Sequence, residues 1–419
     1  MICKNRVLPL VLCMVMAEQG RAQTEITQVT SASDSTELVD GGLYLFSSDV
    51  VIEKERYGYA GCHISKSSYR PADHIIYYMG GPPYFSQVSA AVPGSDLVRL
   101  YKSGTDDHGN CRYLMYDVTN GFYIFQDTTY PAIYRHRSDK GETTSRHLCL
   151  MGSGRKFRML MGNRTLRYQK NMRYYSAPTD AYYKRDPDRY SAVLLYRIDR
   201  LDGYRNLMAS GSDLTAVKGD TVITVDRKFK DNRFNTLMLP CAVSNYKEVF
   251  GLHVQAYELD KKEMGSIVFR KVEGDDLQAN VPYLISGRFA QAPYLIAQTS
   301  MDLPADYRDD QVDVNLNGNH FVGIYRDKQL QGLRAYMLSH NKLFYCKNAD
   351  CRLKAFCWYM TVEDVTKCKL CVVDGKGVLD VIDKEGASGP GNSEHRRRGS
   401  RIPRGTLNSR PHGFCLDTE

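Results

Sequence analysis

The stretch that decides the fold opens with Thr221-Val-Ile-Thr-Val-Asp226, in which β-branched and polar residues alternate. This two-residue period predicts a half-buried strand. Short runs of the same kind continue to about Asp383, and only Asn245–Phe250 has the pattern of a helical turn. Many short strands with turns between them indicate a β-sandwich or barrel, because parallel βαβ units would need helical crossovers. Further strands are predicted at residues 234–239, 253–259, 266–272, 282–285, 293–296, 311–316, 321–325, 343–345, 355–359 and 370–373.

Three groups of residues in this stretch resemble a known module. They are Phe234-Asn-Thr-Leu-Met-Leu-Pro240, Val281-Pro-Tyr-Leu284, and Tyr336-Met-Leu-Ser339 followed by Asn341-Lys-Leu-Phe-Tyr345. Their order and spacing are similar to those of the C-terminal β-sandwich module of secreted and cell-surface proteins of the Bacteroides–Prevotella–Porphyromonas group. The resemblance implies a jelly-roll-like sandwich over residues 221–383 and a location outside the cytoplasm. It implies no chemistry, because the molecular role of that family is mostly unassigned.

Residues 36–205 are also predicted to form a β domain. Gly42-Leu-Tyr-Leu-Phe46 and Gly121-Phe-Tyr-Ile-Phe125 are near copies, which indicates internal symmetry of a barrel or trefoil-like kind, or else an irregular β domain. Residues 206–220 are small, polar and rich in glycine, so we expect an exposed, flexible linker between two domains. Further strands are expected at residues 97–101, 112–116, 156–161 and 192–196.

The first residues predict export. Lys4 and Arg6 precede an apolar run over residues 7–17, and Ala22 closes a small-residue cleavage pattern. Residues 1–22 therefore have the form of a secretory signal peptide. We expect the mature chain to be water-soluble and secreted or held at the outer cell surface, with no membrane-spanning segment. The 419 residues are 42% hydrophobic and 25% charged, which is typical of a globular protein.

Ten cysteines follow the predicted cleavage point. Outside the cytoplasm such cysteines usually form disulfides, so we expect one or two bridges near the predicted 343–359 hairpin. A zinc site is the alternative, but a single Cys-x-x-Cys with no interleaved histidine argues against it, and no cofactor is predicted. The pairing stays open among the candidates Cys346, Cys351, Cys357, Cys368 and Cys371.

A basic segment is the best candidate binding surface. From Tyr134 to Arg173 there are eleven Lys and Arg residues, opposed only by Asp139 and Glu142, with aromatic residues interleaved. This composition suits sulfated or uronic glycans and other polyanions. The alternative is a solvated outer face of strands, whose charges discourage edge pairing. The predicted binding residues are Arg155, Lys156, Arg158, Arg164, Arg167, Tyr168, Arg173, Tyr174 and Tyr175.

No residue pattern indicates catalysis. No Gly-x-Ser-x-Gly and no His-Glu-x-x-His occurs. Cys62 and His63 are adjacent, and adjacent residues on a strand point to opposite faces, so they form no dyad by themselves. Asp313-Val-Asn-Leu-Asn-Gly318 opens like a calcium loop, but Ile324 stands where the final carboxylate is needed, so a strand is favoured. Asp302, Asp306, Asp309 and Asp310 could add calcium ligands, but a loop is favoured there.

The tail after Asp383 changes character. Residues 385–404 are linker-like and then basic, which predicts disorder over 384–419, and a shifted reading frame near residue 390 would also explain the composition.

The leading hypothesis is a two-domain, non-enzymatic binding or adhesion protein that recognises a glycan or a host or cell-surface protein. Nucleic acid is not an expected partner. The alternatives are a fragment of a carbohydrate-active enzyme and a structural spacer of a surface assembly.

Overall fold

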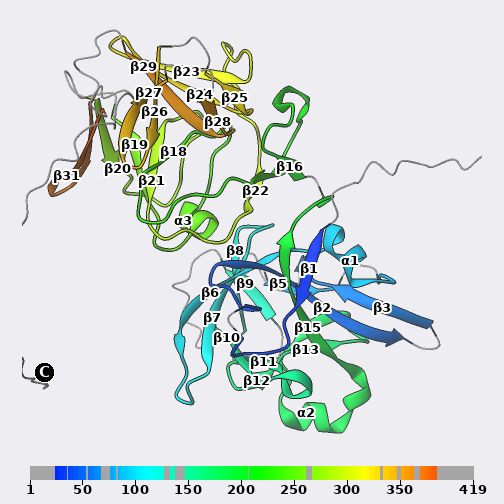
Figure 1. Cartoon of the computed structure of the whole chain (residues 1–419). Coiled ribbons are helices and arrows are strands. Elements are labelled where there is room, and N and C mark those ends of the chain that lie inside the picture. Colours follow the sequence, from blue (N-terminus) through cyan, green and yellow to red (C-terminus); the bar gives the residue numbers. More distant parts are fainter. Residues whose placement is uncertain are drawn as a thin grey trace, which may run out of the picture. The chain divides into compact units, whose positions relative to one another are not determined.

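The protein is an all-β molecule built from several curled antiparallel sheets (Figure 1). In the computed structural model, strands make up 51% and helices 9% of the described residues, which confirms the predicted fold class. None of the helices in the described part is long and apolar enough to cross a membrane. The structure describes residues 24–34, 36–52, 55–67, 76–81, 84–126, 133–136, 147–205, 207–260, 267–330, 334–346, 351–362 and 369–384.

The first half of the chain forms one fifteen-stranded sheet system, whose long central path runs β12-β11-β10-β7-β6-β2-β15-β13-β14-β5-β4. Its strands are β1 (Glu25–Gln28), β2 (Gly42–Ile52), β3 (Glu55–Gly61), β4 (His63–Ser67), β5 (Ile76–Gly80), β6 (Val98–Thr105), β7 (Cys111–Asp117), β8 (Phe122–Gln126), β9 (Ile133–His136), β10 (His147–Met151), β11 (Arg158–Met161), β12 (Arg164–Thr165), β13 (Arg167–Gln169), β14 (Tyr174–Ser176) and β15 (Tyr190–Arg200).

Strand β2 lies at the centre of this system, because it pairs with β6, β15 and β3. Its residues Leu43, Tyr44, Leu45 and Phe46 are all buried, on both faces of the strand. A strand buried on both faces has a continuous apolar sequence instead of an alternating one. The glycine-led apolar run at residues 42–46 is therefore the signature of a central strand.

Helical segments are few and short. The α-helices are α1 (Val88–Ala91), α2 (Asp180–Arg185) and α3 (Tyr246–Phe250), and the 3₁₀ helices are η1 (Val92–Gly94), η2 (Gly154–Lys156), η3 (Pro187–Arg189) and η4 (Leu214–Ala216). The predicted helical turn at residues 245–250 is confirmed as α3. Helix α2 is capped by Thr179, whose hydroxyl accepts a hydrogen bond from the Tyr182 amide.

The second half of the chain holds four further sheets of three, six, five and two strands. The six-stranded sheet has the order β18-β21-β19-β20-β30-β31, and the five-stranded sheet the order β23-β24-β29-β26-β27. The strands are β16 (Leu207–Ala209), β17 (Thr221–Val225), β18 (Asn235–Leu237), β19 (Gln255–Leu259), β20 (Ile267–Lys271), β21 (Tyr283–Ser286), β22 (Tyr294–Thr299), β23 (Gln311–Leu316), β24 (Asn319–Ile324), β25 (Lys328–Gln329), β26 (Ala335–Ser339), β27 (Lys342–Tyr345), β28 (Arg352–Leu353), β29 (Cys357–Val362), β30 (Lys369–Asp374) and β31 (Gly377–Asp383).

The six-stranded and five-stranded sheets pack on each other around the single tryptophan. The Trp358 ring on β29 stacks on Phe269 of β20 with ring centroids 5.5 Å apart, and it meets Phe321 of β24 edge-on at 5.4 Å. The indole N–H donates to the Tyr283 carbonyl on β21 at 2.8 Å. All four residues are buried. Aromatic side chains from two sheets interleave in this way in a β-sandwich core.

Most predicted strands coincide with observed ones to within two residues. The β23–β24 hairpin occupies the residues that could have been an incomplete calcium loop, as the strand interpretation predicted. The strand expected from Lys156 begins two residues later, at Arg158, because residues 154–156 form η2.

The segment expected to be an exposed linker contains regular structure. Strand β16 pairs in parallel with β17, and Leu214 of η4 is buried, so the expectation of full exposure is wrong at this residue. The buried cluster that contains Leu214 also includes side chains from both halves, such as Leu43 and Phe250. Residues up to Lys384 form one compact unit, and the division into two domains stays a prediction.

Candidate functional site

The basic residues predicted to bind a ligand lie in the turn between β10 and β11, on β11, β12 and β13, and, in the case of Arg173, in the turn between β13 and β14. Strand β10 pairs with β11, and β11 pairs with β12, all antiparallel. The β10–β11 connection contains η2, which brings Arg155 and Lys156 next to Arg158 at the start of β11. All three of these side chains are exposed.

Gly152 is required at this turn. Its φ is +73°, in the left-handed region that favours glycine, and a Cβ there would meet the Lys156 carbonyl oxygen at 2.5 Å. Two backbone hydrogen bonds attach the turn to the start of the chain: Ala32 N–H donates to the Gly152 carbonyl at 3.0 Å, and Gly154 N–H to the Thr30 carbonyl at 2.8 Å. The backbone therefore fixes the turn that carries Arg155 and Lys156.

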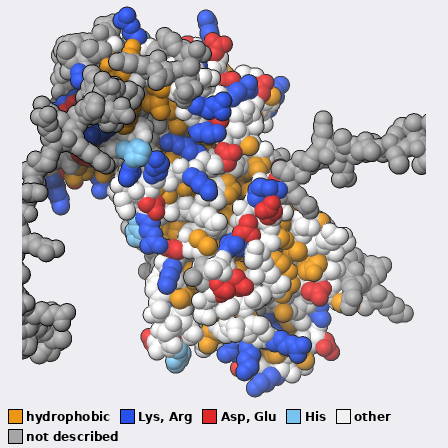
Figure 2. All heavy atoms as spheres, in the orientation of Figure 1, with side chains coloured by type: hydrophobic (Ala, Val, Ile, Leu, Met, Phe, Trp, Pro, Cys, Tyr) orange, Lys and Arg blue, Asp and Glu red, His pale blue; other side chains and the backbone are white. Residues whose placement is uncertain are grey.

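These residues surround a cavity of about 600 Å³, which we call the basic pocket. Its cations come from the turn, from β11 and from β13, and its apolar wall includes Phe157 and Met159. No carboxylate is among the described residues that line it. Figure 2 shows Lys and Arg side chains gathered in the lower part of the view, where Figure 1 places β12 and α2. The lining cations are Arg155, Lys156, Arg158 and Arg167.

Arg167 also joins the pocket to helix α2. Its guanidinium carbon lies 3.6 Å from the centre of the Tyr183 ring, a cation–π contact that fixes the direction of the side chain. A guanidinium held over a ring still exposes N–H groups at its edge, and these can donate to an anion.

Two of the nine predicted binding residues are wrong. Tyr168 and Tyr175 are fully buried, and their rings meet edge-on with centroids 5.1 Å apart. The Tyr175 hydroxyl donates to the Ala60 carbonyl at 2.8 Å, and burial raises the pKa of this phenol well above its usual value. The reason is strand geometry: Arg167 and Tyr168 are adjacent on β13, so their side chains point to opposite faces.

The other predicted residues lie beside the basic pocket without lining it. Arg164 and Tyr174 are half-buried. Arg173 is exposed, and its guanidinium carbon lies 6.0 Å from the centre of the Tyr84 ring. Four further basic residues of the segment have side chains outside the described residues: Arg135, Arg137, Lys140 and Arg146.

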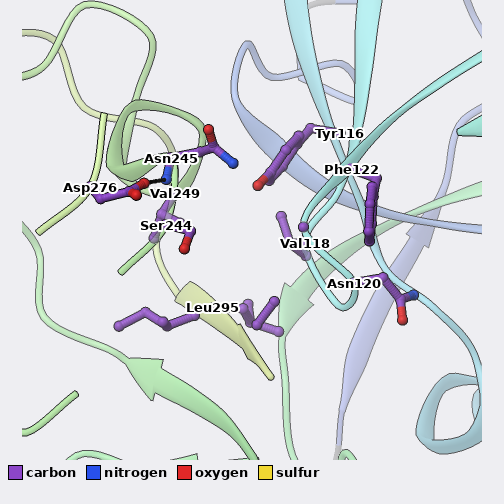
Figure 3. Close-up of a pocket in the computed structure, with 12 residues that line it drawn as sticks. Tyr116, Val118, Asn120, Phe122, Ser244, Asn245, Val249, Asp276 and Leu295 are labelled. Carbon is purple, nitrogen blue, oxygen red and sulfur yellow. Dashed lines mark hydrogen bonds between the residues drawn. The ribbon is translucent and has the colours of Figure 1, made fainter. Parts of the chain in front are cut away.

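A second cavity, of about 500 Å³, was not predicted from the sequence (Figure 3). We call it the seam pocket, because its walls come from both halves of the chain: the β7–β8 hairpin, the residues before and within α3, the loop before Leu277, and strand β22. Its floor is apolar and buried, with Val118, Val249 and Leu295. No local signal in the sequence could have revealed it, since its residues are up to about 180 positions apart.

The polar groups of the seam pocket are amides, hydroxyls and one carboxylate. Figure 3 shows Tyr116 and Phe122 on one side and Ser244, Asn245 and Asp276 on the other. The Asn245 amide N–H donates to Asp276 Oδ1 at 3.0 Å. Burial raises the pKa of Tyr116, so this hydroxyl stays protonated.

The walls of the seam pocket are braced by Glu248 of α3. Its carboxylate accepts a hydrogen bond from the Tyr123 hydroxyl at 2.7 Å, and its carbonyl accepts one from Tyr101 at 2.5 Å. Tyr123 packs edge-on against Tyr116 with centroids 5.2 Å apart. The hairpin wall is therefore tied to the helix wall by hydrogen bonds between buried groups.

The predicted disulfides are not present among the described cysteines. Cys346, Cys351, Cys357 and Cys371 are free thiols, and Cys368 lies outside the described residues. Cys357 accepts a hydrogen bond from Arg227 Nη1 at 2.7 Å instead of bonding to another sulfur. Burial is the largest cause that raises the pKa of the Cys346 thiol to about 12.

The remaining candidate chemistry finds no support in the geometry. Cys62 is fully buried, and its burial raises the pKa of the thiol well above the usual value, so it cannot serve as a thiolate nucleophile. His63 instead pairs with the buried Asp96 at 3.4 Å, and Arg205 holds the other oxygen of that carboxylate. Within the described residues, no group of His, Cys, Asp and Glu side chains could hold a metal ion.

Comparisons with known proteins return no relative. No family model matches the chain, no curated protein matches it, and no solved structure matches its fold.

Proposed function

We propose that this protein binds acidic glycans, carrying sulfate or uronic carboxylate groups, in the basic pocket. The observation that carries the proposal is the grouping of Arg155, Lys156, Arg158 and Arg167 around one cavity whose described lining contains no carboxylate. None of the four forms an ion pair with a carboxylate of the described residues, so their charges are available to an anionic ligand. The proposal keeps the predicted polyanion surface but removes the two buried tyrosines from it.

The chemistry of the pocket suits this class of ligand. Arginine presents a planar array of donors that matches carboxylate and sulfate oxygens, and charge-assisted hydrogen bonds are about twice as strong as neutral ones. Phe157 gives the pocket an apolar side that can pack against the C–H face of a sugar ring. The volume of about 600 Å³ is within the usual range for small-ligand sites, and accommodates one or two sugar rings.

Two further features belong to the proposal. The apolar segment at residues 7–17 supports export, so that the ligand would be an extracellular polymer. The resemblance to secreted and surface β-sandwich proteins supports the same location. We propose binding without catalysis, in which the protein adheres to a matrix or surface glycan.

The test is a binding assay with the mature chain on immobilised heparin, polygalacturonate and a neutral polysaccharide of similar length. We expect binding to the two acidic polymers only, weakening steeply with salt because exposed charges are screened within about 10 Å at moderate ionic strength. The combined variant Arg155→Glu, Lys156→Glu and Arg158→Glu should weaken binding by about 100-fold or more, since each lost charged hydrogen bond costs about 1.5–3 kcal/mol.

The matched control makes the same change in net charge elsewhere. Lys230, Arg233 and Lys271 are exposed and belong to the second half of the chain, so their joint replacement by Glu should leave most of the affinity intact. An equal loss of affinity in both triple variants would mean that the total charge of the protein, and not the basic pocket, controls binding. Binding of neither acidic polymer, or release of reducing sugar ends from one of them, would reject the proposal.

A further inference from the structure

We infer that the seam pocket is a second ligand site, which takes a neutral saccharide of one or two rings. This inference is independent of the proposed acidic-glycan site, because the two pockets share no residue. It assigns a role to a cavity that the sequence did not reveal.

The first argument is charge. The described lining of the seam pocket contains no Lys or Arg, and its one charged group is Asp276. Glu248, which braces the wall, adds a second carboxylate behind Tyr123. An anionic ligand is therefore disfavoured here, in contrast to the basic pocket, and a neutral ligand rich in hydroxyl groups is favoured.

The second argument is hydrogen-bonding capacity. The Ser244 side chain is exposed and has no hydrogen-bond partner among the described residues. Asp276 uses only Oδ1 for the Asn245 amide, so Oδ2 is available to accept two hydroxyl protons. Tyr116 presents its hydroxyl from the opposite wall, where the Asn120 side-chain N–H donates to Asp117 at 2.7 Å. Acceptors and amphoteric hydroxyls on opposite walls match the alternating hydroxyls of a sugar ring.

The third argument is the apolar surface. Phe122 and Tyr116 form one wall and Leu295 part of the floor, so one face of the pocket is aromatic and the other polar. A pyranose has the same division, with C–H groups on its faces and hydroxyls at its edge. The volume of about 500 Å³ is typical of sites that enclose a small ligand.

The pocket is also preorganised. Asn245 has a φ of +53°, a left-handed conformation that asparagine tolerates, and its backbone N–H is held by Asp276. The Tyr123–Glu248 hydrogen bond joins the two walls. A ligand would therefore enter a formed cavity with little ordering of side chains.

The test is saturation-transfer NMR on the full chain with glucose, galactose, mannose, N-acetylglucosamine and their homo-disaccharides, and with glucosamine as a cationic probe. We expect at least one neutral sugar to receive saturation at millimolar concentration. Ser244→Trp should fill the cavity from an exposed position and weaken that binding at least tenfold. Ala242→Trp is the control, because Ala242 is also exposed but does not line the pocket.

A second variant tests the same site in case Ser244→Trp does not fold. Asp276→Asn keeps an oxygen to accept from the Asn245 amide, and should weaken sugar binding several-fold by removing the charged acceptor. Heparin binding should be unchanged in both variants, which separates failure of this site from failure of the basic pocket. Absence of saturation transfer to every neutral sugar, binding of glucosamine alone, or wild-type affinity in Ser244→Trp would overturn the inference.

Discussion

Arg99 joins the two halves of the chain from a buried position. Its side chain on β6 is fully buried, and its guanidinium donates to the carbonyl of Gly41 in the first half and to those of Gln291 (2.8 Å) and Pro293 (2.9 Å) in the second. No carboxylate partners it among the described residues. Burial lowers the pKa of this guanidinium, so the carbonyl groups are what hold the charge in the interior.

Replacing Arg99 by Met should lower the free energy of unfolding by about 3 kcal/mol, because it removes a buried donor from three carbonyls, of which, among the described residues, only that of Gly41 also accepts from a backbone N–H, that of Gln291. Urea unfolding followed by circular dichroism measures the change. The control is Arg233→Met, at an exposed arginine, which should cost less than about 0.5 kcal/mol. Equal stabilities of the two variants would show that Arg99 does not join the halves energetically.

At the scale of an element, the β23–β24 hairpin shows how a short turn fixes register. Leu316 pairs with Asn319, so Asn317 and Gly318 form a two-residue turn, and their φ values are +52° and +82°. Both values match a type I′ turn, for which Asn-Gly is the preferred sequence.

Gly318→Ala should lower the free energy of unfolding by about 1–2 kcal/mol, since alanine is strained at positive φ. Gly375→Ala is the control: it is also in a hairpin turn, but its φ is not in the left-handed region and a Cβ there meets no atom within 4 Å. The melting temperatures of the two variants, measured by calorimetry, should therefore differ, with Gly318→Ala lower. A cost at Gly375 as large as that at Gly318 would contradict the turn assignment.

The elements also explain what the sequence could and could not predict. Strands such as β23, predicted at residues 311–316, were located correctly because alternation and turn residues are local signals. Four of the predicted binding residues line one cavity, the basic pocket, and they are close enough in the chain for the sequence to group them. Tyr168 was predicted at the binding surface together with Arg167. Adjacent residues of a strand point to opposite faces, so the tyrosine is buried instead. The seam pocket was missed because Tyr116 and Asp276 meet only through tertiary packing.

At the scale of the whole molecule, the tyrosine content sets the response to alkali. Burial raises the pKa of Tyr44, Tyr196, Tyr283 and Tyr294 from 10.0 to about 12 in each case. Between about pH 10 and about pH 12 the unfolded chain loses phenol protons that the folded chain keeps. The contribution of the buried neutral phenols to the free energy of unfolding is therefore complete below about pH 10 and is lost progressively as the pH rises toward about 12.

We expect the free energy of unfolding to fall between about pH 10 and about pH 12, with little change from this cause between about pH 8 and about pH 9. Urea unfolding at several pH values, with tyrosinate absorbance recorded in parallel, measures it. Tyr196→Phe should make the fall less steep, while Tyr182→Phe, at a tyrosine that is 56% exposed, should not. A stability that is flat across this range would contradict the burial of the phenols.

The parallel pairing of β20 with β30 has a consequence for synthesis of the chain. Ile267 lies beside Leu370, so one edge of β20 meets its partner strand only after about a hundred further residues have been made. A nascent chain that ends before residue 369 presents the backbone donors and acceptors of that edge to any other strand in reach. The six-stranded sheet can therefore be completed only after β30 and β31 have been made.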